Sequence, residues 1–135
     1  MQNIRWVQRF ENFEKASTNL TETTECIKQN GINKIYTMAL IQAYEIVFEL
    51  AWKTMKDYLQ FNGIITDTPR ETIKEAFSKN IISDGQIWIE MMETRNKASH
   101  TYREEYAKRL CDDILNVYSK QITDLLEFFK GKING

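Results

Sequence analysis

Residues that interrupt secondary structure are scarce in this chain of 135 residues, which has one proline and five glycines. All-β folds need many short strands joined by turns, and these two residue types supply most turns. Their scarcity favours a few long helices. No apolar run approaches the roughly 18 residues of a transmembrane helix, and the N-terminus lacks the apolar stretch of a signal peptide. We therefore expect a cytoplasmic protein with no membrane association.

Metal-binding residues are also scarce. Cys26 and Cys111 are isolated and have no metal-ligand spacing, so we expect two reduced, structural cysteines. The one histidine is His100, and a single imidazole with scattered carboxylates does not make a typical zinc site. The chain also lacks GxxxxGK[ST], GxGxxG, CxxC and HExxH motifs. We therefore predict neither a metal nor an organic cofactor.

An excess of positive charge is missing as well. Lysine and arginine total 18 against 19 aspartates and glutamates, which gives a net charge of −1. Non-specific nucleic-acid binding usually requires a basic patch or stripe, so any RNA contact here must be local. The best candidates for such a contact are five cations that lie close together in the sequence, Arg95, Lys97, Arg103, Lys108 and Arg109. Nearby acidic residues dilute this patch.

What the chain does contain is apolar residues at helical spacing, 42% of the total, with seven Phe, six Tyr and three Trp. Their recurrence at steps of three and four predicts helices over residues 3–29, 34–61 and 101–129. A short helix is expected to open at Pro69, and another to run from Ser83 or Asp84 to Lys97 or Ala98. There is no linker or repeat. The prediction is one all-α domain, residues 1–135, folded as an up-and-down four-helix bundle with an additional short helix.

Capping residues and inner faces can be assigned within these helices. Asn33, Thr68 and Thr101 are the expected N-caps, the last two with a glutamate three residues on. The predicted inner faces include Met38 in the second helix, Phe77 in the third and Val117 in the last. Glu45 interrupts the stripe of the second helix. It is either a solvated rim residue or a carboxylate that orients a cation, with Arg95 as the first choice of partner.

The stretch 91–102 is the candidate site. On one unbroken helix Arg95 and His100 would face different directions, since residues five apart differ by roughly 140°. A helix that starts at Thr101 breaks the chain between them, so both side chains can point into one cleft. Arginine can grip phosphate oxygens, and histidine exchanges protons near neutral pH. The alternative is structural, with Arg95 capping helix carbonyls and His100 a satisfied corner residue.

Arg95-Asn96 followed by His100-x-Tyr102 resembles the Arg-x4-His-x-Tyr signature of the HEPN superfamily, in its HepT-like branch. Other stretches are similar to the branch of nucleotidyltransferase substrate-binding proteins. These are residues 48–53, 69–71, 75–77, Trp88 with Met91, and 99–102. The likeness extends from about residue 6 to residue 128.

The resemblance implies a HEPN bundle that forms a homodimer and has a minimal nucleotidyltransferase as its antitoxin partner. It implies a metal-independent endoribonuclease toxin with Arg95 and His100 as catalytic residues. Asn96, within the signature, and Glu45 are assigned supporting roles, and Lys97 and Arg103 are assigned to RNA binding, with tRNA or mRNA as substrate. In some pairs the nucleotidyltransferase adds AMP to the motif tyrosine, here Tyr102, which the Thr101 cap would place in a first helical turn. The alternative is a non-catalytic substrate-binding partner of a nucleotidyltransferase.

Overall fold

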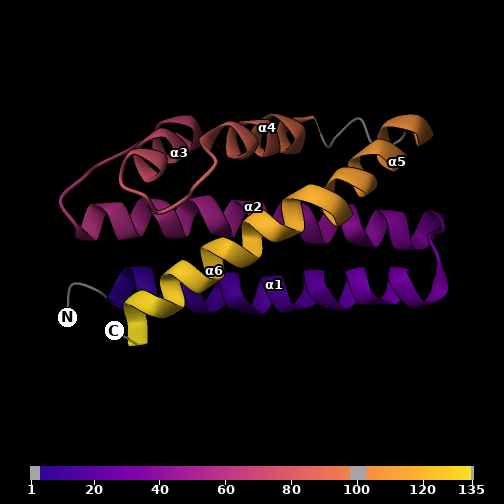
Figure 1. Ribbon diagram of the computed structural model, residues 1–135, viewed down its shortest axis with the longest axis horizontal. Coiled ribbons are helices and arrows are strands. Elements are labelled where there is room, and N and C mark those ends of the chain that lie inside the picture. The colour runs from indigo at the N-terminus through magenta and orange to yellow at the C-terminus, as the bar shows by residue number, and fades with distance from the viewer. Residues whose placement is uncertain (1–3, 98–102, 135) are drawn as a thin grey trace.

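Two long antiparallel helices form the base of the fold. The computed structural model describes residues 4–97 and 103–134, and these residues form helices and no strand. Helices α1 (Ile4–Asn30) and α2 (Lys34–Phe61) lie side by side along the length of the molecule (Figure 1). The predicted bounds of both helices are correct to within one residue.

The remaining helices cover this pair. Helices α3 (Pro69–Ser78) and α4 (Gly85–Asn96) pack along α2 on the side away from α1 (Figure 1). The chain then returns through α5 (Glu104–Asp113), the π-helical turn η2 (Ile114–Tyr118) and α6 (Ser119–Asn134). This last rod crosses α2 and α1 diagonally and ends near the start of α1. The predicted all-α bundle with an additional short helix is confirmed.

Local capping explains where the helices begin. The Asn33 side chain accepts a hydrogen bond from the Tyr36 amide at 2.8 Å, and Gly31 before it has a φ of 80°, which glycine adopts readily. The Thr68 hydroxyl caps α3, and the Asp84 carboxylate caps α4. These caps were predicted from sequence, with Ser83 as the alternative to Asp84.

The last helix differs from its prediction of 101–129 at both ends. It begins at Glu104, with Arg103 in the cap position and no side-chain capping bond, and it continues to Asn134. Thr101, the expected cap, lies outside the described residues. The π turn adds a residue to one turn and rotates the faces, so that Tyr118 is 1% exposed and Val117 is 37% exposed. The placement of Val117 on the inner face was therefore wrong.

The core lies where α2 meets α1, α4 and α6. The predicted stripe of α1 is buried throughout, and α2 contributes buried residues along its length from Leu40 to Leu59. Met38 and Phe77, both predicted to face inward, are instead 63% and 51% exposed. Phe77 lies over the backbone of Gly85, where an added Cβ would come within 3.1 Å of its ring. Of the two free cysteines, Cys111 is buried and Cys26 is half-buried.

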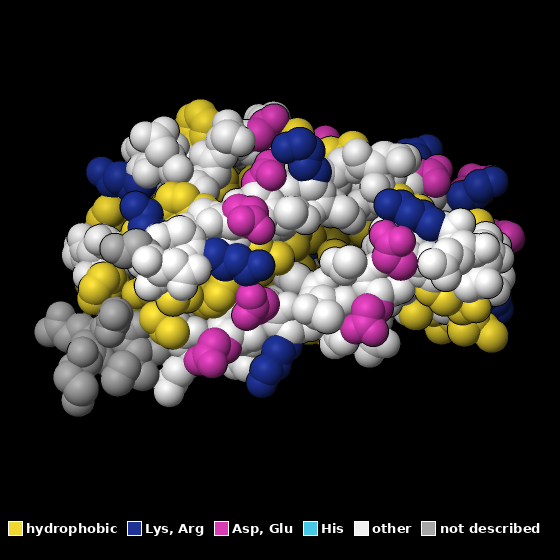
Figure 2. Space-filling model, turned by 60° about the horizontal axis from the view of Figure 1, so that its bottom comes forward, with side chains coloured by type: hydrophobic (Ala, Val, Ile, Leu, Met, Phe, Trp, Pro, Cys, Tyr) yellow, Lys and Arg dark blue, Asp and Glu magenta, His cyan; other side chains and the backbone are white. Residues whose placement is uncertain are grey.

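The surface is mixed in charge. On the face drawn in Figure 2, cationic and acidic side chains are interspersed, and the described residues form no continuous field of one sign there. This agrees with the net charge of −1. Among the helices of the described residues, none combines the length and the apolar character needed to cross a membrane.

Candidate functional site

The candidate site lies at the carboxyl end of α4. Arg95 is in its last turn, Asn96 is its last residue, and Lys97 follows as the C-cap. The predicted end of this helix near Lys97 is therefore confirmed. Arg103 lies exposed just before α5. His100 and Tyr102 lie outside the described residues, so the structure does not test the roles predicted for them.

Arg95 forms an ion pair with helix α2. Its Nη2 lies 3.1 Å from Oε2 of Glu49, and the two side chains are 38% and 33% exposed. The predicted partner was Glu45, one turn earlier on α2, and that pairing is wrong. Glu45 is half-buried and has no ion pair with any residue that the structure describes. The end of α4 approaches α2 at the turn that contains Glu49.

Glu49 is itself held on both carboxylate oxygens. The indole Nε1 of Trp52 donates to Oε2 at 3.2 Å, and Nζ of Lys53 lies 3.4 Å from Oε1. The Glu49–Lys53 pair was predicted from its spacing of four residues. Arg95 thus docks onto a carboxylate whose orientation is already fixed by two neighbours on its own helix.

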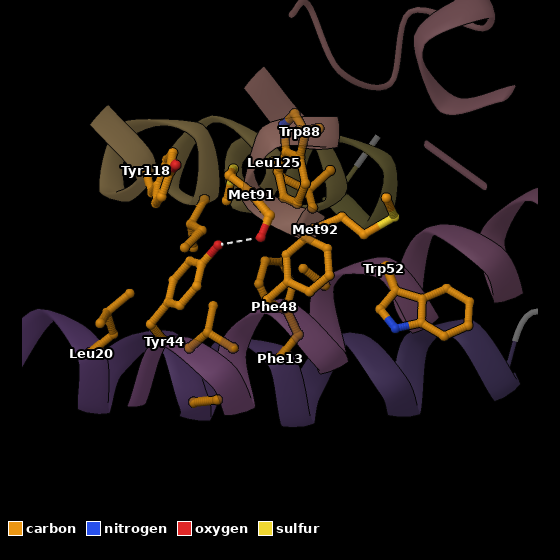
Figure 3. Packing of buried hydrophobic residues seen from close by; sticks show 14 of the residues in the cluster. Phe13, Leu20, Tyr44, Phe48, Trp52, Trp88, Met91, Met92, Tyr118 and Leu125 are labelled. Atoms are coloured by element: carbon orange, nitrogen blue, oxygen red, sulfur yellow. Dashed lines mark hydrogen bonds between the residues drawn. The ribbon is translucent and has the colours of Figure 1, made fainter. Parts of the chain in front are cut away.

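Tyrosine side chains hold the turn of α4 that precedes Arg95. The Tyr44 hydroxyl donates to the Met91 carbonyl at 2.8 Å across the core (Figure 3). The Tyr106 hydroxyl lies 3.5 Å from the Thr94 carbonyl, a long contact. These bonds come from α2 and α5, so helices on two sides fix the position of the last turns of α4.

Tyr118 adds a third hydroxyl to this arrangement. It donates to Oε2 of Glu90 at 2.8 Å and lies 3.2 Å from the Thr94 hydroxyl, while its ring stacks on that of Tyr44 with centroids 5.6 Å apart. Burial, with Glu90 nearby, raises the pKa of the Tyr118 phenol, and burial raises that of Tyr44 further. Both phenols therefore remain protonated donors at neutral pH. The π turn places Tyr118 toward α4.

An open groove of about 220 Å³ runs between α4 and α5 beside this site. It is lined by acidic, basic and aromatic residues of both helices, namely Glu90, Glu93, Thr94, Lys97, Tyr106, Arg109, Leu110 and Asp113. A second hollow of about 730 Å³ at the start of α5 shares Tyr106 and Arg109 and adds Arg103 with two glutamates. Lys97 and Arg109 of the predicted basic cluster thus line one groove, although its acidic residues outnumber them.

Asp113 also lines this groove, near Glu90 and Arg109. Burial, followed by the charges of Glu90 and Asp112, raises the pKa of its carboxyl, and Arg109 opposes this only in part. Uncompensated acidic charge here counts against a phosphate in this part of the groove. No group of three or more His, Cys, Asp or Glu side chains suited to a metal ion occurs within residues 4–97 and 103–134.

An uncharged stripe on α2 leads toward Glu49. Its members are exposed and lie on one face of the helix, namely Ile35, Met38, Ala39, Gln42 and Ile46. Ile35 is 75% exposed and Ile46 is 49% exposed. No charged residue occurs between Lys34 and Glu45, in a protein in which 27% of residues are charged. Exposed apolar area of this kind is typical of protein interfaces.

Sequence reasoning missed Glu49, Trp52 and the three tyrosines as parts of the site. Glu49 was interpreted as one half of a surface pair, and the aromatic residues as core. A signal was available for the tyrosines, because a buried phenol usually finds a hydrogen-bond partner. Nothing in the sequence, however, specifies that these partners lie on α4.

Comparisons with known proteins identify relatives. Residues 8–131 match the family described as "Nucleotidyltransferase substrate binding protein like". A curated relative, "Probable ribonuclease HepT" of Haemophilus influenzae, is 38% identical over 72 residues, which are 50% of this chain and 49% of the relative. The match thus spans about half the length of that protein.

Two solved structures are similar in fold. One, from Haemophilus influenzae, is described as revealing the fold of a substrate binding domain of a nucleotidyltransferase. It has a TM-score of 0.81 and 26% identity, and the match covers 90% of this chain and 98% of that one. The other, from Thermus thermophilus, has a TM-score of 0.77 and 24% identity, covering 85% and 96%, and shows the fold alone.

Proposed function

The chain belongs to the nucleotidyltransferase substrate-binding protein-like family, and from that premise we propose that it is a HepT-like, metal-independent endoribonuclease. The observation that carries the proposal is the presentation of Arg95. Its Nη2 lies 3.1 Å from Oε2 of Glu49, and Arg95 is in the last turn of α4, two residues before Lys97, which lines the groove between α4 and α5. An arginine held in this way can direct further N–H groups at a phosphate. The relative named probable ribonuclease HepT supports the assignment.

The proposed chemistry is transfer within the RNA strand. The 2′-oxygen attacks the adjacent phosphorus and the bond to the 5′-oxygen breaks, which leaves a 2′,3′-cyclic phosphate. His100 takes the proton of the 2′-hydroxyl, the departing 5′-oxygen takes a proton from water, and Arg95 stabilises the charge that develops on the phosphate oxygens. Asn96 is proposed to support the site, and Lys97 and Arg103 to contact the RNA backbone. Because RNA supplies the nucleophile, DNA is not a substrate.

Cleavage by the isolated chain tests this proposal. Labelled tRNA or mRNA incubated with the protein in EDTA should yield 2′,3′-cyclic phosphate ends, while an all-DNA strand stays intact. His100→Ala and Arg95→Ala should each reduce the rate at least about 100-fold, the usual scale for general acid–base groups. Lys130→Ala is the matched control, since it removes a cation that pairs with Glu14 of α1 instead. Loss of activity in EDTA contradicts the mechanism.

We also propose that the active form is a homodimer whose two-fold axis passes near the Arg95–His100 corner. One arginine and one histidine make a sparse site for phosphodiester chemistry, and a two-fold axis brings a second copy of each to the same groove. The uncharged stripe of α2 supports this assembly, because Ile46 lies one turn before Glu49 on the same face. A face without charges can meet its own copy without repulsion.

Control of the enzyme is proposed to act on Tyr102. A minimal nucleotidyltransferase antitoxin would transfer AMP from ATP to the phenol oxygen, with pyrophosphate as the leaving group. The added phosphate could pair with Arg95 or Lys97 and block the cleft. Arg103 is the N-cap of α5, and Tyr102, for which a position in the first helical turn was predicted, lies outside the described residues. On co-expression, intact-mass analysis should show whole AMP units added to the wild type and none to Tyr102→Phe.

One observation favours a second function, that of a non-catalytic partner subunit that presents substrate to a nucleotidyltransferase. The groove between α4 and α5 has more acidic than basic residues, and the whole chain is close to neutral. These properties do not favour binding of a polyanion. If the isolated wild-type chain leaves RNA intact but binds a nucleotidyltransferase, this second function replaces the first.

A further inference from the structure

The ion pair between α2 and α4 determines how the proposed site presents its arginine. We propose that Glu49 is the positioning residue that fixes the orientation of Arg95, and that Trp52 and Lys53 in turn hold Glu49. This proposal rests on the proposed endoribonuclease function for its catalytic meaning. Its structural content stands on the contacts alone, namely Arg95 Nη2 at 3.1 Å from Glu49 Oε2 and Trp52 Nε1 at 3.2 Å from the same oxygen.

Glu49 is set in place by its own helix. Trp52 is three residues further along α2 and Lys53 four, so both donors lie on the face of the helix that carries the carboxylate. Trp52 is only 8% exposed, and its indole ring is a rigid support. The carboxylate therefore has little freedom before Arg95 reaches it.

The geometry of Arg95 indicates that its ion pair with Glu49 orients the side chain and adds little to the stability of the fold. Its Nε is buried and donates to no atom of the residues that the structure describes. A buried N–H without a partner is costly, whereas a half-exposed ion pair contributes little to stability. A contribution to the stability of the fold therefore does not explain this arrangement well. A role in orienting the guanidinium explains it better, since the Nη2 contact with Glu49 holds one corner of the group and leaves other N–H groups for phosphate oxygens.

Two roles for Glu49 predict opposite results. As a positioning residue it aids catalysis, whereas as a competitor for the guanidinium it would oppose the binding of phosphate. Under the proposal, Glu49→Ala should lower kcat about 10- to 100-fold, the scale of a catalytic group displaced by about an ångström, while the Kd for RNA changes less than about threefold. An increase in kcat, or a loss confined to Kd, overturns the proposal.

Matched variants separate positioning from general effects of charge and stability. Glu14→Ala removes a carboxylate that also pairs with a cation on another helix, Lys130 at 3.8 Å, and should leave kcat unchanged. Trp52→Phe keeps every charge and an aromatic ring but removes one donor to Glu49, so it should lower kcat in the same direction by a smaller factor. A Glu14→Ala effect equal to that of Glu49→Ala contradicts the assignment.

A second readout does not depend on cleavage. In the wild type the Arg95 Nε–Hε group should give a resolved NMR cross-peak that exchanges slowly with water, because the nitrogen is buried and the side chain is held. In Glu49→Ala this signal should broaden or collapse toward those of free arginines. An inactive wild type with this spectral change removes the endoribonuclease proposal and retains the positioning role. An unchanged spectrum removes the positioning role whatever the activity.

Discussion

Replacement of Tyr44 by phenylalanine tests how the last turns of α4 are held. The side chain is 0% exposed and donates to the Met91 carbonyl at 2.8 Å, and the substitution keeps the ring that stacks on Tyr118. A neutral hydrogen bond contributes about 1 kcal/mol net, and a buried group left without any partner costs about 1–3 kcal/mol. Because a helical carbonyl also accepts a backbone bond, we expect a loss of about 1–1.5 kcal/mol in the free energy of unfolding.

Urea denaturation followed by circular dichroism measures this loss as a lower midpoint at an unchanged slope. The matched control is Tyr58→Phe, since Tyr58 packs on Trp6 and Phe129 but its hydroxyl has no hydrogen-bond partner within the described part of the chain. Its loss should stay within about 0.5 kcal/mol. Amide exchange should also quicken in α4 of the Tyr44 variant. Equal losses in the two variants would refute the reasoning.

Three further predictions concern single residues. Asp57→Ala should lower the free energy of unfolding, measured in urea, by about 1.5–3 kcal/mol, because its buried carboxylate accepts a charged hydrogen bond at 2.9 Å from an arginine of α1. A loss as small as that of an exposed ion pair contradicts this prediction. Burial, with Glu90 nearby, raises the pKa of Asp113 above its ordinary 3.8, so its contribution to stability falls as pH rises through the folded-state pKa. Asp113→Asn should therefore become more stable relative to the wild type as the pH rises from about 4 to 7, measured as the difference in free energy of unfolding in the same urea assay. A difference that does not change with pH contradicts this prediction. Met38→Lys should convert the dimer to monomers in sedimentation velocity, whereas Ile133→Lys, at another exposed apolar position, should not; a persistent Met38→Lys dimer contradicts the α2 interface.

Much of the fold follows from local signals in the sequence. Apolar spacing located α1 and α2 to within one residue, because one buried stripe must repeat with the period of the helix. Asn33, Thr68 and Asp84 were identifiable as caps, since a cap bonds to amides two or three residues away. The same reasoning correctly placed Arg95 in the last turn of a helix.

Local signals failed where the same pattern of residues fits two different helix starts, registers or faces. Thr101 had the spacing of a capping box, yet α5 begins at Glu104. The π turn at 114–118 changes the register of the last helix, and an ideal period of 3.6 residues therefore assigned Val117 to the wrong face. Met38 fitted the inner stripe of α2 equally well, although no other helix of the described residues covers that side of it.

The sequence by itself determined the helical class, most helix starts and the residue types of the candidate site. Only the tertiary structure decided which groups meet there. Glu45 and Glu49 are one turn apart on α2, so their sequence positions do not show which one lies beside Arg95. The choice depends on how far α4 extends along α2, which Tyr44, Tyr106 and Tyr118 fix through bonds between helices. The periodic pattern of a helix specifies the direction in which a side chain points from the helix axis. Which residue that side chain meets on a neighbouring helix depends on how far the two helices are shifted along each other, and packing sets that shift.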